Sequence, residues 1–537
     1  MAEGRTRREV LRDGAGVAAA SVLTAPWMEA QAATRPAGGS FDAGSVEHLL
    51  PTATHDRLRL KASFERRLSD APRLRLGGRT FTGRQSDTEG RFWHWDVSGL
   101  DANRRYGLRL LNGRGRNLTE PWSIRTFPAP NARPDRLRLL IFTCAGGHDL
   151  FREFRLFKPV RSRHRLLRRG LSFDPDAVIA NGDHVYFDLE AGAAGAIMGG
   201  SDLAKRRVGR FNPSLPALGS ANERVLQRAA GPQIVPLYGT ECRSVPTFFL
   251  TDDHDYFEND EASERQLTFP PPWWKIQLAR ATQRLYYPEF LPVRGQPEGL
   301  PWTTSGGSRR GLSEIFGALR YGRLLEFMMY EVRRTQTLAG PSAVFVDPQA
   351  ERWITNRVRG SDATHVVTMP SNPFGWTAGK WGEWYPDVLV DGRLRTDQPK
   401  PFWQTGWLSQ HDRIMNAIAD RQRGARLVVG GDIHATAAGV VTRSGDRDMS
   451  STPIQIALSG TLGTDQNTFP SGFRGTPPRP SGHLTMNEQI QPLEENGFMI
   501  ADFTSDRVVM RFFRWNGQNE ADIDKLEPFQ TIEVPSA

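Results

Sequence analysis

The sequence predicts a layered α/β fold, in which a mixed β sandwich is flanked by helices, and a small all-β sandwich domain in front of it. Two different patterns of apolar and polar residues predict these two parts. Residues 45–130 hold short alternating runs separated by Gly, Asp and Asn turns, which is typical of an antiparallel sandwich. Residues 136–528 hold apolar, strand-like runs interleaved with helical segments. The 537 residues are too many for one compact core and accommodate both domains after a leader.

Residues 1–33 resemble a twin-arginine signal peptide. Arg7 and Arg8 precede a weakly apolar run over residues 15–27, and residues 30–32 read Ala-Gln-Ala, a small-residue cleavage pattern. The alternative is a basic disordered tail, which needs neither feature. The signal predicts export of the folded protein by the twin-arginine translocation machinery, so we expect a periplasmic or secreted protein. No later apolar run reaches membrane-spanning length, and we expect no transmembrane segment in the mature chain.

The first domain has the alternation of a half-buried sheet. Residues 58–62 and 106–110 alternate apolar and polar side chains. Residues 99–106 resemble the tyrosine corner of fibronectin-type sandwiches, with Tyr106 as the tyrosine. Prolines then mark a linker before residue 136. Since nothing here has catalytic spacing, we expect this domain to pack on, or frame, the domain that follows.

The second domain is predicted from apolar runs of strand length and from amphipathic segments of helix length. Each of the chemically informative motifs falls just after one of the runs. The predicted strands cover 137–143, 177–181, 247–251, 324–330, 365–369, 427–430, 454–458, 498–503 and 508–513, and the predicted helices cover 160–169, 274–286 and 409–421.

Metal-binding side chains follow the predicted strands at four places. They are carboxylates, an imidazole, a thiol and a phenol, which seldom gather at strand ends for packing reasons. Ligands in layered α/β folds bind beyond the carboxyl ends of the strands, so we expect one shared two-metal hydrolase centre. The leading interpretation is therefore phosphoester hydrolysis. The predicted ligands are Cys144, Asp183, Tyr186, Asp253, Asp432 and His434.

The two cysteines have an alternative interpretation, because an exported protein can form a disulfide between Cys144 and Cys242. Cys144 ends a strand-like run and is followed by Ala-Gly-Gly, where the backbone turns sharply and a side chain can point into a cleft. This setting favours a ligand. Cys242 has no such setting and is predicted to be structural.

His254 is predicted to act on the substrate. It directly follows the ligand Asp253, so its imidazole can face the substrate, stabilise phosphate oxygens or protonate the leaving alcohol. The alternative is a core histidine whose ring is satisfied by a carbonyl.

These motifs resemble, in the same order, those of the alkaline phosphatase D (PhoD-like) family of calcineurin-like metallophosphoesterases. Three details differ from the family pattern: Phe142 stands one residue too close to Cys144, Asp255 replaces a Glu, and Glu331-Val332-Arg333 stands where the family usually has Asp-x-Arg. The matched residues are Cys144 of Phe-x-x-Cys, Gly182, Asp183 and Tyr186 of Gly-Asp-x-x-Tyr, Asp252, Asp253, His254 and Asn259 of Asp-Asp-His-Glu followed by Asn, and Gly431, Asp432 and His434 of Gly-Asp-Val-His.

The resemblance covers nearly the whole mature chain and implies a metallophosphoesterase-type fold with a fibronectin-like N-terminal domain. It implies an exported alkaline phosphatase or phosphodiesterase that hydrolyses phosphate esters with a metal-bound hydroxide at a binuclear centre of Fe³⁺ and Ca²⁺. Asp183 is the expected bridge between the ions, and His254 is the expected acid.

The resemblance also divides the ligands between the ions. Tyr186, Cys144 and His434 are expected to complete the iron site, because a phenolate, a thiolate and an imidazole suit that ion. Asp253 and Asp432 supply oxygen ligands for calcium. The residues expected to contact the substrate or to support the ligands are Asn259, Arg333 and Asp252.

Charge and aromatic content leave other functions open. The net charge of +9 suits an anionic substrate, although a basic surface of mixed sign is the simpler alternative, and no obligate nucleic-acid partner is expected. The Trp-rich segments 271–274 and 375–381 wall the cleft or cover the core. The alternative functions are a phospholipase D-like phosphodiesterase that uses the same centre and a non-catalytic secreted metal-binding protein.

Overall fold

The structure is a computed structural model that describes residues 41–150, 155–186, 205–256, 270–305, 310–338, 340–378 and 403–537. Residues Ala43–Ala537 form one compact unit. The predicted leader with Arg7 and Arg8, the predicted site residue Asn259 and the end of the Trp-rich segment 375–381 lie outside the described residues. Within the described ranges, no helix combines the length and the hydropathy needed to cross a membrane.

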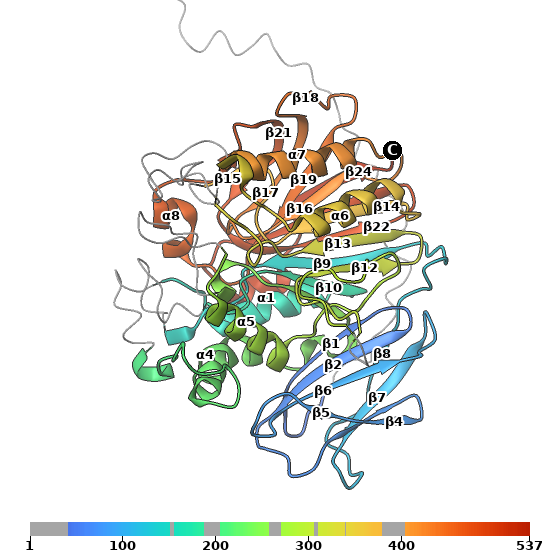
Figure 1. Cartoon of the computed structure of the whole chain (residues 1–537), viewed down its shortest axis with the longest axis vertical. Coiled ribbons are helices and arrows are strands. Elements are labelled where there is room, and N and C mark those ends of the chain that lie inside the picture. The colour runs from blue at the N-terminus through green and yellow to red at the C-terminus, as the bar shows by residue number, and fades with distance from the viewer. Residues whose placement is uncertain are drawn as a thin grey trace, which may run out of the picture. The chain divides into compact units, whose positions relative to one another are not determined.

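Two four-stranded sheets make up the N-terminal region, drawn in blue in Figure 1. Their neighbouring strands are antiparallel, as predicted. The backbone N–H of Asp101 donates a hydrogen bond of 2.7 Å to Tyr106 Oη, the contact that defines a tyrosine corner. The first sheet has the order β1 (Val46–Ala53), β2 (Arg57–Phe64), β6 (Phe92–Ser98), β5 (Arg84–Gln85), and the second has β4 (Arg79–Thr82), β3 (Arg73–Leu76), β7 (Arg105–Leu111), β8 (Trp122–Arg125).

A six-stranded sheet begins the second region. Its first three strands along the chain are parallel, and the strand that pairs with the first of them from the other side is antiparallel. The parallel strands therefore end at one edge, where the loops toward the site begin. The order is β11 (Thr247–Leu250), β10 (Ala177–Asn181), β9 (Leu137–Thr143), β22 (Asn496–Phe503), β23 (Arg507–Trp515), β24 (Gln530–Pro535).

An eight-stranded sheet lies against the first one. Four of its neighbouring strands, β13, β14, β16 and β19, are parallel. The order is β12 (Phe316–Tyr321), β13 (Leu325–Tyr330), β14 (His365–Pro370), β16 (Leu427–Gly430), β19 (Ile454–Ser459), β17 (Thr436–Ser444), β18 (Arg447–Asp448), with β21 (Leu484–Leu493) also paired to β17.

Apolar side chains on both faces of the strands explain the layers. In β9, Leu137, Leu139 and Ile141 point into the core between the two sheets, whereas Leu140 and Phe142 point into a core beneath helices. Helices thus cover the outer faces of both sheets, and the predicted layered α/β fold is confirmed (Figure 1). The helices are α1 (Val160–Leu171), α4 (Ala221–Tyr238) and α5 (Trp273–Tyr286) beside the six-stranded sheet and α6 (Pro348–Gly360) and α7 (Thr405–Ala419) beside the eight-stranded sheet.

Further short elements lie in the connections between the strands. They are the two-stranded sheet of β15 (Trp376–Thr377) and β20 (Arg479–Pro480), the helix α8 (Pro470–Arg474), and the 3₁₀ turns η3 (Glu241–Ser244), η4 (Asp253–Tyr256), η6 (Gly340–Ser342), η7 (Gln466–Thr468) and η8 (Glu520–Lys525).

The N-terminal sheets hold the C-terminal end of α5. Lys61 Nζ donates to the carbonyl oxygen of Gln283 at 2.5 Å, and His48 Nε2 lies 2.9 Å from that of Tyr286. The last carbonyls of a helix have no partner within the helix, so these side chains cap it. Burial lowers the pKa of Lys61 to about 7, and Glu289 opposes this shift.

The helix α5, which these side chains cap, also contacts the predicted site. Ile276 and Ala279 of α5 pack against Tyr256 in the turn η4, which also carries Asp253 and His254. The N-terminal region is therefore in contact with a helix that supports a predicted catalytic segment, although it contributes none of the predicted ligands.

Candidate metal centre

The predicted ligands follow strands of both large sheets. Cys144 follows β9, Asp183 follows β10, and Asp253 begins the turn after β11 in the six-stranded sheet. Asp432 and His434 follow β16 in the eight-stranded sheet. These four strands bring their carboxyl ends to one region, which is where layered α/β proteins build their sites.

Four of these residues have a strained backbone. Cys144, Asp183, Asp432 and His434 have φ values of 48°, 52°, 66° and 55°, and they are half of the eight non-glycine residues with positive φ in the described chain. A side chain in this region costs roughly 1–2 kcal/mol per residue. Such conformations persist where the surroundings enforce them, and they cluster at functional sites.

Two glycines let the loops approach one another. Gly182 has a φ of 76°, and a Cβ there would lie 2.7 Å from the Cβ of Asp252. A Cβ on Gly431 would lie 2.5 Å from Asn181 Nδ2. Both Gly-Asp motifs therefore need their glycine for a close backbone approach.

The loops bring the donor atoms into three overlapping groups. In each group, one atom from every member lies within 4.8 Å of the others. Asp183 belongs to two groups and Asp253 to two, so these carboxylates are placed between neighbouring positions for a cation. The groups are Cys144, Asp183 and His434; Asp183, Asp253 and His254; and Asp252, Asp253 and Asp432.

Tyr186 joins the first group through hydrogen bonds. Its Oη donates to Asp183 Oδ2 at 3.0 Å and lies 3.0 Å from His434 Nε2. His434 Nδ1 lies 2.8 Å from the carbonyl oxygen of Thr468, which accepts a hydrogen bond from it. This bond places a proton on Nδ1 and turns Nε2 toward Tyr186 and Asp183.

Cys144 is a free thiol at the same place. Its Sγ lies 3.1 Å from Thr143 Oγ1 and 3.5 Å from the carbonyl oxygen of Asp432. Cys144 and Cys242 are both free and buried, so the disulfide alternative is wrong. Burial raises the pKa of the Cys144 thiol, and the carboxylates of Asp183 and Asp432 raise it further.

His254 lies at the edge of the centre with two roles open to it. Its ring centroid is 4.1 Å from that of Tyr186, and its backbone N–H donates to Asp253 Oδ1 at 2.9 Å. A ring nitrogen of His254 also belongs to a donor group with Asp183 and Asp253. The geometry therefore suits a group that acts on the substrate and also a metal ligand.

Gln233 of α4 supports the site and was not predicted. Its Oε1 accepts hydrogen bonds from the backbone N–H groups of Gly147 at 2.7 Å and Tyr186 at 2.9 Å. Its Nε2 donates to the carbonyl oxygen of Tyr186 at 3.0 Å. One buried amide thus ties the loop after Cys144 to the loop after Asp183, and no motif in the sequence marks it.

Asp255 and His184 also serve the loops. Asp255 accepts hydrogen bonds of 3.0 Å from the backbone N–H groups of Val185 and Asp252, so it braces one loop against the other. His184 Nε2 lies 2.5 Å from the carbonyl oxygen of Leu250, and burial lowers its pKa to about 4. His184 is therefore a neutral core histidine.

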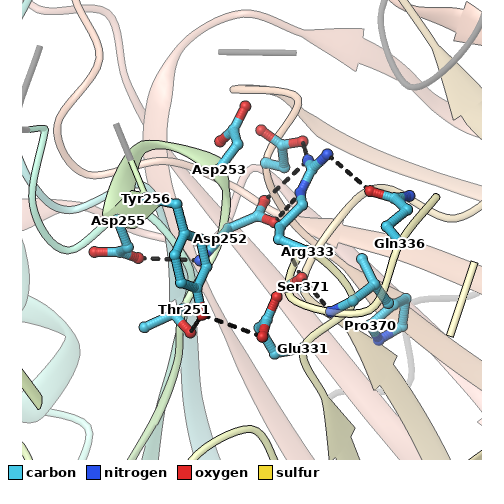
Figure 2. Close-up of polar contacts among 12 residues, drawn as sticks. Thr251, Asp252, Asp253, Asp255, Tyr256, Glu331, Arg333, Gln336, Pro370 and Ser371 are labelled. Atoms are coloured by element: carbon cyan, nitrogen blue, oxygen red, sulfur yellow. Dashed lines mark hydrogen bonds and ion pairs between the residues drawn. The ribbon is translucent and has the colours of Figure 1, made fainter. Parts of the chain in front are cut away.

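Arg333 lies against Asp252, a member of the third donor group, as Figure 2 shows. Arg333 Nε donates to Asp252 Oδ1 at 2.5 Å, and its Nη2 donates to Asp432 Oδ2 at 2.7 Å. All three side chains are fully buried. Glu331, two residues before Arg333, points elsewhere and accepts a hydrogen bond of 3.2 Å from Tyr256 Oη.

The donor chemistry fits two different cations. Thiol, phenol, imidazole and carboxylate gather around Asp183, a set that suits a transition metal, whereas carboxylates gather around Asp253, a set that suits a hard divalent ion. Burial raises the pKa of Tyr186, and Asp183 and the Cys144 thiol raise it further. A cation among these groups favours their anionic forms and reverses that direction.

Comparisons with known proteins find a phosphatase family and two phosphatase structures of similar fold. A family model described as PhoD-like phosphatase matches residues 154–512, a range that begins after Cys144 and includes the other predicted ligands. A solved structure of PhoD is 14% identical, covers 93% of this chain and 90% of its own, and has a TM-score of 0.55. The purple acid phosphatase from yellow lupin (Lupinus luteus) seeds is 11% identical over 91% of this chain and 73% of its own, with a TM-score of 0.53. Among curated proteins, none matches the chain.

Proposed function

Because this chain belongs to the PhoD-like phosphatase family, we propose that it is an exported, metal-dependent phosphoric ester hydrolase with a binuclear centre. The observation that carries the proposal is the convergence of donors from both sheets on Asp183 and Asp253. The phosphatase structures with a similar fold support a phosphoesterase.

We assign the ions from the donor chemistry. Cys144, Tyr186, His434 and Asp183 would hold Fe³⁺, because these groups can supply a thiolate, a phenolate, an imidazole and a carboxylate. Asp253, Asp432 and Asp183 would hold Ca²⁺ through oxygen. When bound, the ions supply Lewis acidity to a phosphoryl oxygen and lower the pKa of a water molecule.

The side chains of the protein would hold the loops of the site in place and protonate the leaving group. Asp183 is placed between the donor groups and fixes their spacing, and Gln233 and Asp255 keep the loops in place. His254 lies at the edge, where its imidazole can give a proton to the departing alcohol oxygen. No serine or threonine nucleophile is needed, since water attacks the phosphorus opposite the ester oxygen.

A substrate panel tests the proposal. Purified protein should hydrolyse p-nitrophenyl phosphate or bis-p-nitrophenyl phosphate, lose that activity in a calcium chelator, and regain it when Ca²⁺ is added back. The oxygen-only position should exchange its ion more readily than the position with thiol and phenol donors. Hydrolysis of phospholipids alone would favour the phospholipase D-like alternative, and bound metals without turnover on any ester would favour the non-catalytic one.

Replacing Tyr186 by Phe should remove a visible absorption band. A tyrosinate bound to ferric iron gives a charge-transfer colour, and Tyr186 Oη lies 3.0 Å from His434 Nε2 in the proposed iron site. Tyr238→Phe is the matched control, because Tyr238 is also buried but lies at the end of α4. Absorption spectra of the two variants and the wild type test this prediction. If the band persists in Tyr186→Phe, Tyr186 is not an iron ligand.

Replacing Arg7 and Arg8 together by Lys should block export without changing cytoplasmic activity. A translocation receptor reads the arginine pair, and the pair lies outside the predicted domains. Cell fractionation with an immunoblot measures the distribution. Normal export of the double variant would rule out the twin-arginine route.

A further inference from the structure

Arg333 is buried among carboxylates of the centre. It follows β13, its side chain has no exposed surface, and it reaches Asp252 from the six-stranded sheet and Asp432 from the eight-stranded sheet. One guanidinium therefore joins the strand-end loops of both sheets (Figure 2). Arginine suits this position, since its planar fork can bind two carboxylates at once and keeps its charge when buried.

Asp252 differs from Asp432 in how its oxygens meet Arg333. Asp252 Oδ1 accepts from Arg333 Nε at 2.5 Å and from Ser371 Oγ at 3.0 Å. Asp252 Oδ2 accepts from Arg333 Nη2 at 3.5 Å. Asp432 meets the same guanidinium through Oδ2, at 2.7 Å. Both oxygens of Asp252 therefore face Arg333, although its position in the third donor group would also suit a cation.

The negative charge of the buried Asp252 carboxylate needs a compensating positive charge. A buried carboxylate is stable only when a cation or several hydrogen-bond donors compensate it. We propose that Arg333 is a positioning residue that takes the place of a cation for Asp252. Asp252 then belongs to an internal ion pair and not to the metal-binding set, and the same guanidinium orients Asp432 toward the divalent ion. The inference rests on the proposed function only for the presence of that ion.

The proposal predicts what removal of the guanidinium does. In Arg333→Met, two buried carboxylates lose their compensating charge, so the site should take up one additional Ca²⁺ per chain and its stability should depend on Ca²⁺. Arg333→Lys keeps the charge and loses the fork, so it should keep the wild-type stoichiometry. In the double variant Asp252→Asn with Arg333→Met, the carboxylate and its cation are removed together, so the additional Ca²⁺ should not bind.

The experiment measures bound Ca²⁺ per chain by equilibrium dialysis with elemental analysis, and Tm as a function of Ca²⁺ concentration. Arg333→Met should melt several degrees below the wild type without Ca²⁺ and recover most of the difference with it. The double variant should melt above Arg333→Met when Ca²⁺ is absent. Arg421→Met is the matched control: Arg421 is also buried, but it donates to the carbonyl oxygens of Val358 and Ala363, so its loss should lower Tm without a Ca²⁺-dependent recovery.

Two results would overturn the proposal. One is an Arg333→Met variant with unchanged Ca²⁺ stoichiometry and a Tm deficit that Ca²⁺ does not restore. The other is an Arg333→Met variant with wild-type Ca²⁺ binding and wild-type Tm but a raised KM, which would make Arg333 a substrate contact. The Ca²⁺ stoichiometry and the Tm are measured without substrate turnover, and only the KM needs it. A failure of the proposed hydrolase activity would therefore leave the first two measurements intact and be recognised separately.

Discussion

Replacement of Asp183 by Asn should cost the protein its metals and nearly all of its turnover. Asp183 contributes to two donor groups, one with Cys144 and His434 and one with Asp253 and His254. An amide has the same size as the carboxylate but lacks its charge and offers one oxygen. Since the loss of a single electrostatic stabiliser lowers kcat by about 10²–10³-fold, the loss of a shared ligand should lower it by more than about 10³-fold.

Elemental analysis and phosphate release measure both effects on the same sample. Asp448→Asn is a suitable control, because Asp448 is exposed in β18 and should change neither metals nor rate. Thermal unfolding checks that Asp183→Asn still folds. Retention of both ions and of more than a tenth of the turnover by folded Asp183→Asn would rule out the shared position given to Asp183.

Replacement of His254 by Ala should lower turnover on the order of 10²–10⁴-fold, the effect of losing a general acid, while the metals and the colour remain. The physical reason is position: the ring centroid of His254 lies 4.1 Å from that of Tyr186, with the two rings tilted by 38°, at the edge of the proposed iron ligands. The effect should be smaller for esters with an acidic alcohol, such as p-nitrophenol, because such a leaving group needs less protonation.

His434→Ala provides the contrast for His254→Ala. His434 Nε2 faces Tyr186 and Asp183, so its loss should remove iron and colour together with activity. If His254→Ala also loses metal, His254 is a ligand, as its donor group with Asp183 and Asp253 permits. Full activity of His254→Ala would exclude both roles.

The strands beside the centre could be predicted because strands that are buried on both faces appear in the sequence as continuous apolar runs. β9, β10 and β16 are apolar on both faces, and their predicted ranges 137–143, 177–181 and 427–430 match the structure. The donors follow these strands directly. The sequence could therefore predict that the carboxyl ends hold the site, and the structure brings the predicted donors together there.

Helix α4 could not be predicted, because it contains Pro232 and Pro236, which ordinarily interrupt a helix. Tertiary contacts compensate for the destabilising effect of these prolines. Pro232 cannot donate to the carbonyl of Arg228, and the side chain of His148 forms a hydrogen bond with that carbonyl instead. The helix then buries Leu226, Ala230 and Ile234 against the sheet. The support that α4 gives to the Tyr186 loop depends on this packing, which joins segments that are distant in the sequence.

The pairing of Arg333 with Asp252 was also beyond the sequence. The two residues are 81 positions apart and come from different sheets. A motif can mark each of them as relevant, but only the fold shows that the fork of Arg333 faces a carboxylate and not open space. The same holds for Thr468, whose carbonyl accepts the hydrogen bond from His434 Nδ1 from 34 positions away.

In the proposed centre, two cations of different kinds lie between the strand-end loops of the two sheets. A crystal structure with anomalous diffraction measured on both sides of the iron edge tests it most directly. We expect an iron peak bound by Cys144 Sγ, Asp183, Tyr186 Oη and His434 Nε2, and a second ion, without an iron signal, about 3.5–4 Å away beside Asp253 and Asp432. Protein that is active on phosphate esters but holds no ion between these residues would contradict it.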